Sequence, residues 1–134
     1  MRLIRGLTNL KHIAGSADSP LADGCVATIG NFDGVHRGHK TIIDQVKGKA
    51  RVLNLPSVVM IFEPQPQEFF KGAEAPPRLM PFRQKFEALL GEGVDVVLCI
   101  RFDETFRNYS GMGFIEDVLI NGLGVRHLVV GDDF

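Results

Sequence analysis

Four short apolar runs constrain the fold of this chain more than any other feature of the sequence. They are CVATIG (residues 25–30), PSVVMIF (56–62), VDVVLCIRF (94–102) and RHLVVG (126–131). Each run is rich in β-branched residues and is apolar at nearly every position, rather than at every second position. This pattern is typical of strands that are buried on both faces, as in a parallel sheet. The sequence therefore predicts four buried strands of one parallel sheet.

Helical patterns separate these runs. Segments 38–53, 82–90 and 110–121 repeat apolar residues at a spacing of three or four, and the last follows Ser110, a good N-cap residue. The expected inward stripes are Ile42, Ile43, Val46 and Ala50; Phe82, Phe86, Leu89 and Leu90; and Phe114, Ile115, Val118 and Leu119. Strands that alternate with helices predict right-handed crossovers and a Rossmann-like, three-layer α/β/α fold.

Two segments have a weaker pattern. Near the N-terminus, RLIRGL is a candidate edge strand, and GSADSPLADG, residues 15–24, reads as a loop. Residues 63–81 contain five of the seven prolines and form the longest stretch that we expect to be irregular. Long loops in compact domains often bind ligands, so this stretch is a candidate binding loop.

Composition excludes several classes of function. The 134 residues suit one domain, and 15 basic against 16 acidic residues leave a net charge of −1. Such a chain has no broad basic surface for nucleic acid or an anionic membrane, and no apolar stretch approaches the roughly 18 residues of a membrane span. Cys25 and Cys99 each lie within an apolar run, which predicts buried free thiols. With no signal-peptide pattern at the N-terminus, we expect a cytoplasmic protein without an obligate protein partner.

Polar residues follow each predicted strand at its carboxyl end. They are Asn31 and Asp33 after the first strand, Glu63 after the second, Asp103 after the third, and Asp132 and Asp133 after the fourth. Ligands of open α/β sheets bind beyond the carboxyl ends of the strands. We therefore expect the functional site at this edge of the sheet.

Two of the four histidines, His36 and His39, stand where the first of these strands gives way to a helix. Three residues apart at a helix start, they share one face. The free N–H groups and partial positive charge of a helix N-terminus favour a phosphate, and Gly38 has no side chain to keep an anion from the backbone. The segment predicts a seat for a triphosphate.

Other interpretations of these histidines stay open. A zinc site needs three or four ligands, and Cys25, Cys99, His12 and His127 form no pair with metal spacing. Histidines that only cap a helix are the simplest alternative. The chain has neither GxxxxGK[ST] nor GxGxxG, so a P-loop enzyme is not indicated.

Four motifs together resemble a known family. GNFDGVHRGH (residues 30–39) is similar to the nucleotide-binding motif of the HxGH nucleotidyltransferases. FEPQPQEFF (62–70), PPRLMPFRQKFEAL (76–89) and HLVVGDDF (127–134) are similar to the adenylyltransferase domain of bacterial bifunctional FAD synthetases. Cytidylyltransferases share the first motif but not the proline-rich element or the last motif. The resemblance covers essentially all 134 residues.

The resemblance implies a nucleotide site. In such enzymes the two histidines contact phosphates, the glycine between them leaves space for the anion, and the turn before them lies against the nucleotide and helps to organise the phosphates and metal. The matching residues are His36, His39 and Gly38 for phosphate contact; Gly30, Asn31, Phe32 and Asp33 for the turn, with Asp33 as candidate metal ligand; and Asp132 for an acidic position near the nucleotide.

The resemblance also implies a flavin side and a reaction. Pro64, Pro66 and Phe70 match the segment that resembles the flavin-side wall. The implied reaction joins ATP and FMN to give FAD and pyrophosphate, with Mg²⁺ bridging the phosphates. Because the FMN phosphate is already ionised at neutral pH, catalysis would rest on positioning and charge neutralisation rather than on a general base. A non-catalytic domain that binds nucleotide or flavin remains an alternative.

Family members continue beyond the last motif. Their adenylyltransferase domain is longer, and a riboflavin kinase domain follows it. The expectation from the resemblance is that residues 1–134 are an incomplete adenylyltransferase domain, truncated at its C-terminal end, and that they catalyse FAD formation poorly or not at all.

Overall fold

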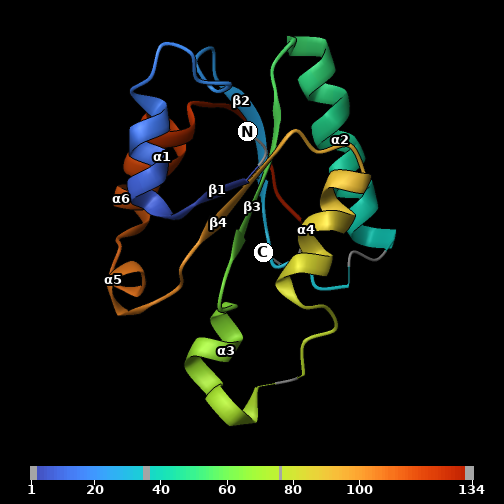
Figure 1. Ribbon diagram of the computed structural model, residues 1–134, viewed down its shortest axis with the longest axis vertical. Coiled ribbons are helices and arrows are strands. Elements are labelled where there is room, and N and C mark those ends of the chain that lie inside the picture. Colours follow the sequence, from blue (N-terminus) through green and yellow to red (C-terminus); the bar gives the residue numbers. More distant parts are fainter. Residues whose placement is uncertain (1–2, 35–36, 76, 132–134) are drawn as a thin grey trace.

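The computed structural model describes residues 3–34, 37–75 and 77–131 as a parallel α/β sheet with helices on both faces (Figure 1). All pairings between neighbouring strands are parallel, in the order β1-β4-β3-β2-β5. The strands are β1 (Leu3–Arg5), β2 (Cys25–Ile29), β3 (Ser57–Phe62), β4 (Val96–Ile100) and β5 (Val125–Val129). The α/β class, the parallel sheet and the N-terminal edge strand are confirmed.

Helices form a layer on each side of this sheet (Figure 1). On one side are α1 (Gly6–Ala14) and α6 (Gly111–Phe114), the latter continuing into the wider π-helical segment η2 (Ile115–Leu123). On the other side are α2 (Arg37–Leu53) and α4 (Phe82–Gly91). Beyond the carboxyl ends of the strands lie α3 (Pro66–Lys71), the short 3₁₀ turn η1 (Gly72–Glu74) and α5 (Glu104–Arg107).

The core lies on both faces of the central strands. Side chains of β3 alternate between two clusters: Val58 and Met60 pack with residues of α1 and η2, whereas Val59 and Ile61 pack with residues of α2 and α4. Every residue of β2, β3 and β4 is buried. The continuous apolar runs therefore predicted two-sided burial correctly for these three strands.

The same prediction is wrong for β5. This strand is the sheet's edge next to β2, its burial is only partial, and Leu128 is 37% exposed. Its apolar sequence looks like that of a central strand, but its position in the sheet leaves one side without a neighbouring strand among the described residues. Strand order is a tertiary property that local hydrophobicity does not encode.

Three local expectations also need correction. Residues 63–81 are not wholly irregular, because Pro66 begins α3 at a helical position that suits proline. Helix α1 occupies residues 6–14, where no helix is predicted, and its short apolar stripe is Leu7, Leu10 and Ile13. Ile115, expected to point inward, is 43% exposed in η2.

Candidate functional site

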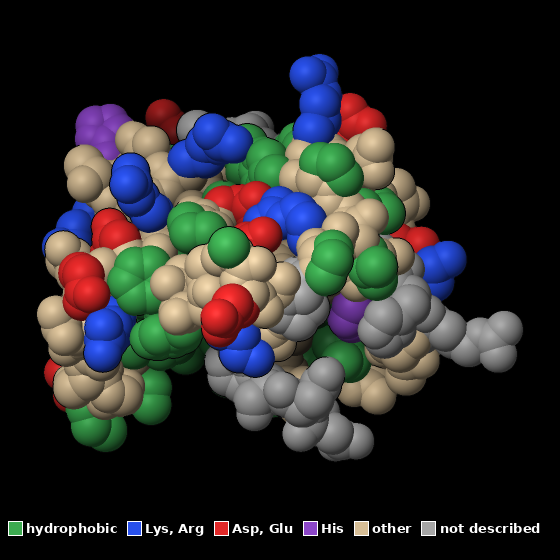
Figure 2. Space-filling view, turned by 90° about the horizontal axis from the view of Figure 1, so that it is seen from below, with side chains coloured by type: hydrophobic (Ala, Val, Ile, Leu, Met, Phe, Trp, Pro, Cys, Tyr) green, Lys and Arg blue, Asp and Glu red, His purple; other side chains and the backbone are tan. Residues whose placement is uncertain are grey.

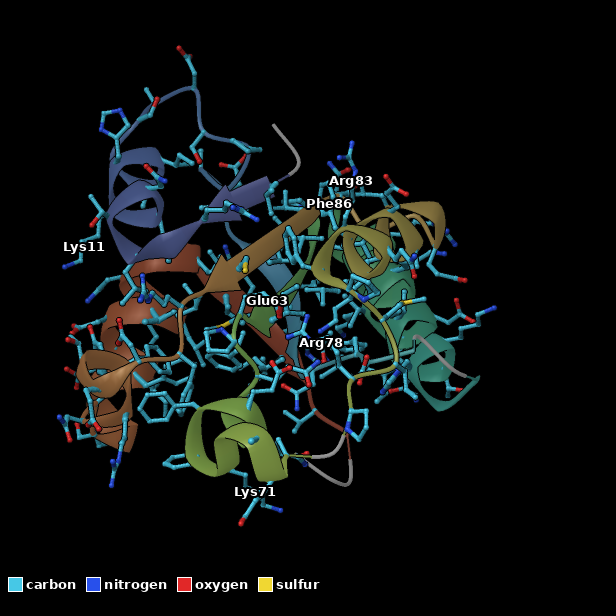
Figure 3. The ribbon with its side chains drawn as sticks, turned by 60° about the horizontal axis from the view of Figure 1, so that its bottom comes forward. Lys11, Glu63, Lys71, Arg78, Arg83 and Phe86 are labelled. Atoms are coloured by element: carbon cyan, nitrogen blue, oxygen red, sulfur yellow. The ribbon has the colours of Figure 1, made fainter. Side chains whose placement is uncertain are left out.

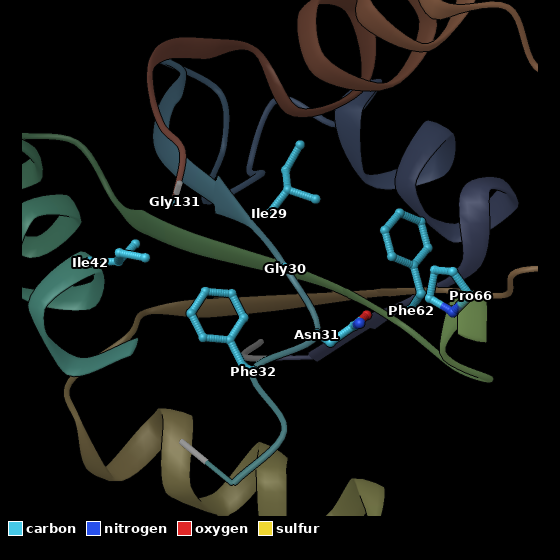
Figure 4. A pocket seen from close by; sticks show the side chains of 8 residues that line it. All are labelled: Ile29, Gly30, Asn31, Phe32, Ile42, Phe62, Pro66 and Gly131. Atoms are coloured by element: carbon cyan, nitrogen blue, oxygen red, sulfur yellow. The ribbon is translucent and has the colours of Figure 1, made fainter. Parts of the chain in front are cut away.

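The turn after β2 borders a cavity of about 230 Å³ at the carboxyl end of the sheet (Figure 4). Gly30, Asn31 and Phe32 contribute one side of this cavity, and Phe62 and Pro66 contribute another. Its remaining lining residues are Ile29, Ile42 and Gly131. The cavity thus joins the ends of three neighbouring strands, β5, β2 and β3, which is where the sequence places a ligand.

Phe32 has an unusual conformation at the centre of this turn. Its φ angle is +52°, uncommon for a residue with a side chain, and its ring is only 3% exposed. The ring folds back over Gly30, where an added Cβ would lie 2.9 Å from Phe32 Cε2. It also lies against His39, with ring centroids 4.9 Å apart. A glycine is therefore required at position 30 so that the Phe32 ring can pack against the backbone there. Through its contact with His39, Phe32 links the turn to the start of α2.

Asp33 ties the same turn to the segment before α4. One carboxylate oxygen accepts the backbone N–H of Leu79 at 2.8 Å, and the other accepts that of Met80 at 2.9 Å. These partners are 46 and 47 residues away in the sequence. The carboxylate therefore holds the turn after β2 against the segment that carries Leu79 and Met80.

Arg78, next to these residues, joins two carboxylates. Its guanidinium donates two hydrogen bonds to Glu63, at 2.7 and 2.9 Å, and two to Glu68, at 2.9 and 2.5 Å. These hydrogen bonds raise the pKa of Arg78, and the bond from Arg78 is the main cause that lowers the pKa of Glu68. Figure 3 shows Glu63 and Arg78 between α3 and the sheet. The three side chains attach α3 to the end of β3.

Phenylalanines gather beside this ion network. Phe102 is the common member: its ring centroid is 5.6 Å from Phe62, 5.4 Å from Phe69 and 5.6 Å from Phe70. Phe70 is 58% exposed, and the Arg107 guanidinium lies 5.5 Å from its ring centroid. Seen onto the carboxyl ends of the strands, acidic and basic side chains meet near the centre of the face, with hydrophobic ones around them (Figure 2). This edge of the molecule can contact both a charged and an aromatic group.

The predicted site residues are distributed as follows. Gly30, Asn31, Phe32 and Pro66 line one cavity. His39 does not line it but packs against the ring of Phe32, which does. Pro64 lines a neighbouring hollow with Arg5, Glu63 and Cys99, and Phe70 lies in the phenylalanine group. Gly38 is exposed in the first turn of α2. Both carboxylate oxygens of Asp33 accept backbone N–H groups, from Leu79 and Met80. His36 and Asp132 lie outside the described residues.

Sequence reasoning missed Arg78 and Lys85. Lys85 is fully buried, at 0% exposure, on the inner side of α4. A signal was present, because Lys85 falls three residues after Phe82 and four before Leu89, on the apolar stripe itself. A charged residue on a stripe that packs into the core is a candidate for a functional role.

Two further observations concern the described segments. Within them, no three histidine, cysteine, aspartate or glutamate side chains are grouped so that they could hold a metal ion. Nor is any helix there both long and apolar enough to cross a membrane.

The family model for FAD synthetase matches residues 18–134. The chain belongs to the FAD synthetase family. The FAD synthetase match includes the turn after β2, α3 and the segment that carries Arg78, so the parts that border the cavity are parts of the family domain.

Curated relatives agree over the whole chain. It is 52% identical over 134 residues to the bifunctional riboflavin kinase/FMN adenylyltransferase of Pseudomonas fluorescens and 48% identical to that of Escherichia coli strain K12. A relative of the same name from Buchnera aphidicola is 37% identical. The chain spans about two fifths of the length of these relatives, 40% of the first and 41% of the second.

Solved structures support the fold. A crystal structure described as a macrolide-efflux protein from Streptococcus pneumoniae aligns with 100% of this chain and 42% of its own, with a TM-score of 0.80 at 22% identity. Pantoate-beta-alanine ligase from Francisella tularensis aligns with 81% of this chain and 38% of its own, with a TM-score of 0.54 at 19% identity. At these identities the similarity concerns the fold alone.

Proposed function

We propose that this domain transfers AMP from ATP to FMN, giving FAD and pyrophosphate. The observation that carries the proposal is the cavity between the turn Gly30–Phe32 and the residues Phe62 and Pro66. One side offers the backbone of a turn next to a helix start, which suits phosphates. The other side adjoins phenylalanine rings, which suit a flat heteroaromatic ring. Membership of the FAD synthetase family supports the same assignment.

The reaction needs positioning more than a nucleophilic side chain. An oxygen of the FMN phosphate attacks the α-phosphorus of ATP, and the bond from that phosphorus to the bridging oxygen breaks as pyrophosphate leaves. His36 and His39 are proposed to donate hydrogen bonds to the α- and β-phosphates, where negative charge increases in the transition state. The contact between the rings of His39 and Phe32 restricts the orientation of His39, which supports this role.

Mg²⁺ fits this scheme as a metal that ATP carries into the site. Magnesium in nucleotide enzymes is commonly held by one or two carboxylates together with the phosphates and water. Asp33 could offer such a carboxylate, because each of its oxygens uses one lone pair for a backbone N–H and retains another. Bound there, Mg²⁺ would neutralise part of the charge on two approaching phosphates.

The relatives are named for two activities, and the proposal assigns one of them to this domain. Riboflavin kinase activity is assigned to the part of a bifunctional protein that these residues do not span. A domain that binds nucleotide or flavin without catalysis is the remaining alternative.

The test is an assay of the natural protein with FMN and MgATP, following FAD by chromatography and pyrophosphate by a coupled reaction. His39→Ala should lower the rate of FAD formation by ~100-fold or more, as loss of a charge-stabilising donor does. His12→Ala, an exposed change in α1, is the matched control and should leave the rate unchanged.

Removal of free Mg²⁺ with EDTA should stop the reaction, and added Mg²⁺ should restore it. Equal formation of FAD and pyrophosphate supports the proposal. Binding of FMN and ATP without either product would refute it in favour of the non-catalytic alternative.

A further inference from the structure

Lys85 is the least expected side chain of the core. It is 0% exposed, and its Nζ has no hydrogen-bond partner among the described residues. Most buried polar atoms have a partner, and a lysine is rarely buried completely unless it is paired. An arrangement that costs stability and persists at a functional edge invites a functional explanation.

The charged groups that interact with Lys85 come from segments next to both sides of the cavity. Its ammonium interacts electrostatically with Glu63, Asp33, Arg78 and the thiol of Cys99. Asp33 belongs to the nucleotide-side turn, and Glu63 precedes the segment with Pro66 and the phenylalanines. The Lys85 ammonium therefore interacts electrostatically with one carboxylate next to each side.

Charge balance shows what the ammonium contributes. The cluster holds three carboxylates, Asp33, Glu63 and Glu68, against two cations, Arg78 and Lys85. Arg78 directs four hydrogen bonds to Glu63 and Glu68. Lys85 is then the cation left to attract Asp33, and it adds to the attraction that Arg78 already exerts on Glu63.

From this arrangement, and on the basis of the proposed adenylyl transfer, we infer that Lys85 is a positioning residue: its ammonium holds the turn Gly30–Asp33 and the segment Glu63–Phe70 at the separation that aligns the FMN phosphate with the α-phosphorus. It touches neither substrate. Each substrate binds mainly to its own side, so the loss of Lys85 acts on the transfer step, which alone requires both sides in register. A misplacement of about 1 Å costs on the order of 100-fold in rate.

The decisive variant is Lys85→Met, which keeps a similar length and volume and removes the charge. In the natural protein, kcat for FAD formation should fall about 10- to 100-fold, while KM for ATP and for FMN changes less than about threefold. Lys85→Arg should recover part of the rate because it restores the cation. Arg83→Met, on the same helix but 88% exposed, is the matched control and should match wild type.

Stability separates positioning from an ordinary structural role. Since a buried cation without a hydrogen-bond partner destabilises the fold, Lys85→Met should unfold at the same temperature as wild type or a higher one. A pH profile adds a second readout. Burial lowers the pKa of Lys85 from 10.5, although the charge of Glu63 opposes this, so wild-type kcat should fall on the alkaline side as the ammonium loses its proton. Lys85→Met should lack that alkaline limb.

If wild type forms no FAD, the proposed function fails and the inference with it. If wild type is active and Lys85→Met retains its kcat, the proposed function stands and the inference is wrong. Failure of Lys85→Met to fold, or clear destabilisation, would also overturn the inference, because the side chain would then be structural.

Discussion

Removal of Arg78 should destabilise the fold by about 2–3 kcal/mol at neutral pH. Its guanidinium makes four hydrogen bonds to Glu63 and Glu68, and the three side chains are only 21–27% exposed. Exposed ion pairs contribute roughly 0–1 kcal/mol, whereas breaking a buried pair costs about 3–5 kcal/mol. This cluster lies between the two cases. The like charge of Lys85 disfavours Arg78 somewhat, which keeps the expected value below the upper range.

The pH dependence of the loss tests the same reasoning. Arg78 lowers the pKa of Glu68 below 4.5, so this part of the stabilisation is present above pH 4.5 and disappears as pH falls through the lowered value. The difference in free energy of unfolding between wild type and Arg78→Met should therefore be largest near pH 7 and shrink in acid. Urea denaturation followed by circular dichroism at pH 7 and at pH 4 would measure this difference.

Arg83→Met is the control for this comparison. Its partner Glu87 is 3.4 Å away, both side chains are mostly exposed at 88% and 65%, and removal should cost less than about 0.5 kcal/mol. A loss for Arg78→Met no larger than that of the control, or one that is the same at pH 4 and pH 7, would refute the assignment of Arg78 as the tie between β3 and α3.

Three other outcomes are expected. Gly30→Ala should weaken ATP binding by about tenfold or more, measured by calorimetry. The added Cβ would lie only 2.9 Å from Phe32 Cε2, so the Phe32 ring would have to move. Ser57→Ala should cost about 1–2 kcal/mol in urea denaturation and leave FAD formation unchanged, since its hydroxyl donates to the Asp95 carboxylate and accepts the Asp95 backbone N–H at the opposite end of the sheet. Burial raises the thiol pKa to about 12 for Cys25 and about 11 for Cys99, so neither should react with a thiol reagent at pH 8 until urea unfolds the chain.

Elements with a strong local signal were predicted well. The runs that became β2, β3 and β4 have apolar side chains on both faces, and this requirement is visible in the sequence because each residue faces one of two buried layers. Helix α4 was predicted at 82–90 and lies at Phe82–Gly91. Short elements such as α5, with four residues, were missed because its single N-cap, Asp103, is a weak signal.

The surroundings of the individual site residues were only partly predictable from the sequence. The motif GNFDGVHRGH located the turn after β2, and the structure brings Gly30, Asn31 and Phe32 to a cavity there. Asp33 looked like a ligand for the nucleotide or its metal. Its observed partners, the N–H groups of Leu79 and Met80, lie too far along the chain for a motif to predict.

The sequence by itself determined the class of fold and the family, and it predicted the edge of the sheet at which the site is expected. These depend on local periodicity and on short motifs, which act over a few residues. Only the tertiary structure decided that β5 is an exposed edge strand, that Arg78 joins Glu63 to Glu68, and that Lys85 is buried and interacts electrostatically with Asp33 and Glu63. The physical reason is that burial and charge pairing depend on distances between segments that the chain brings together only when it folds.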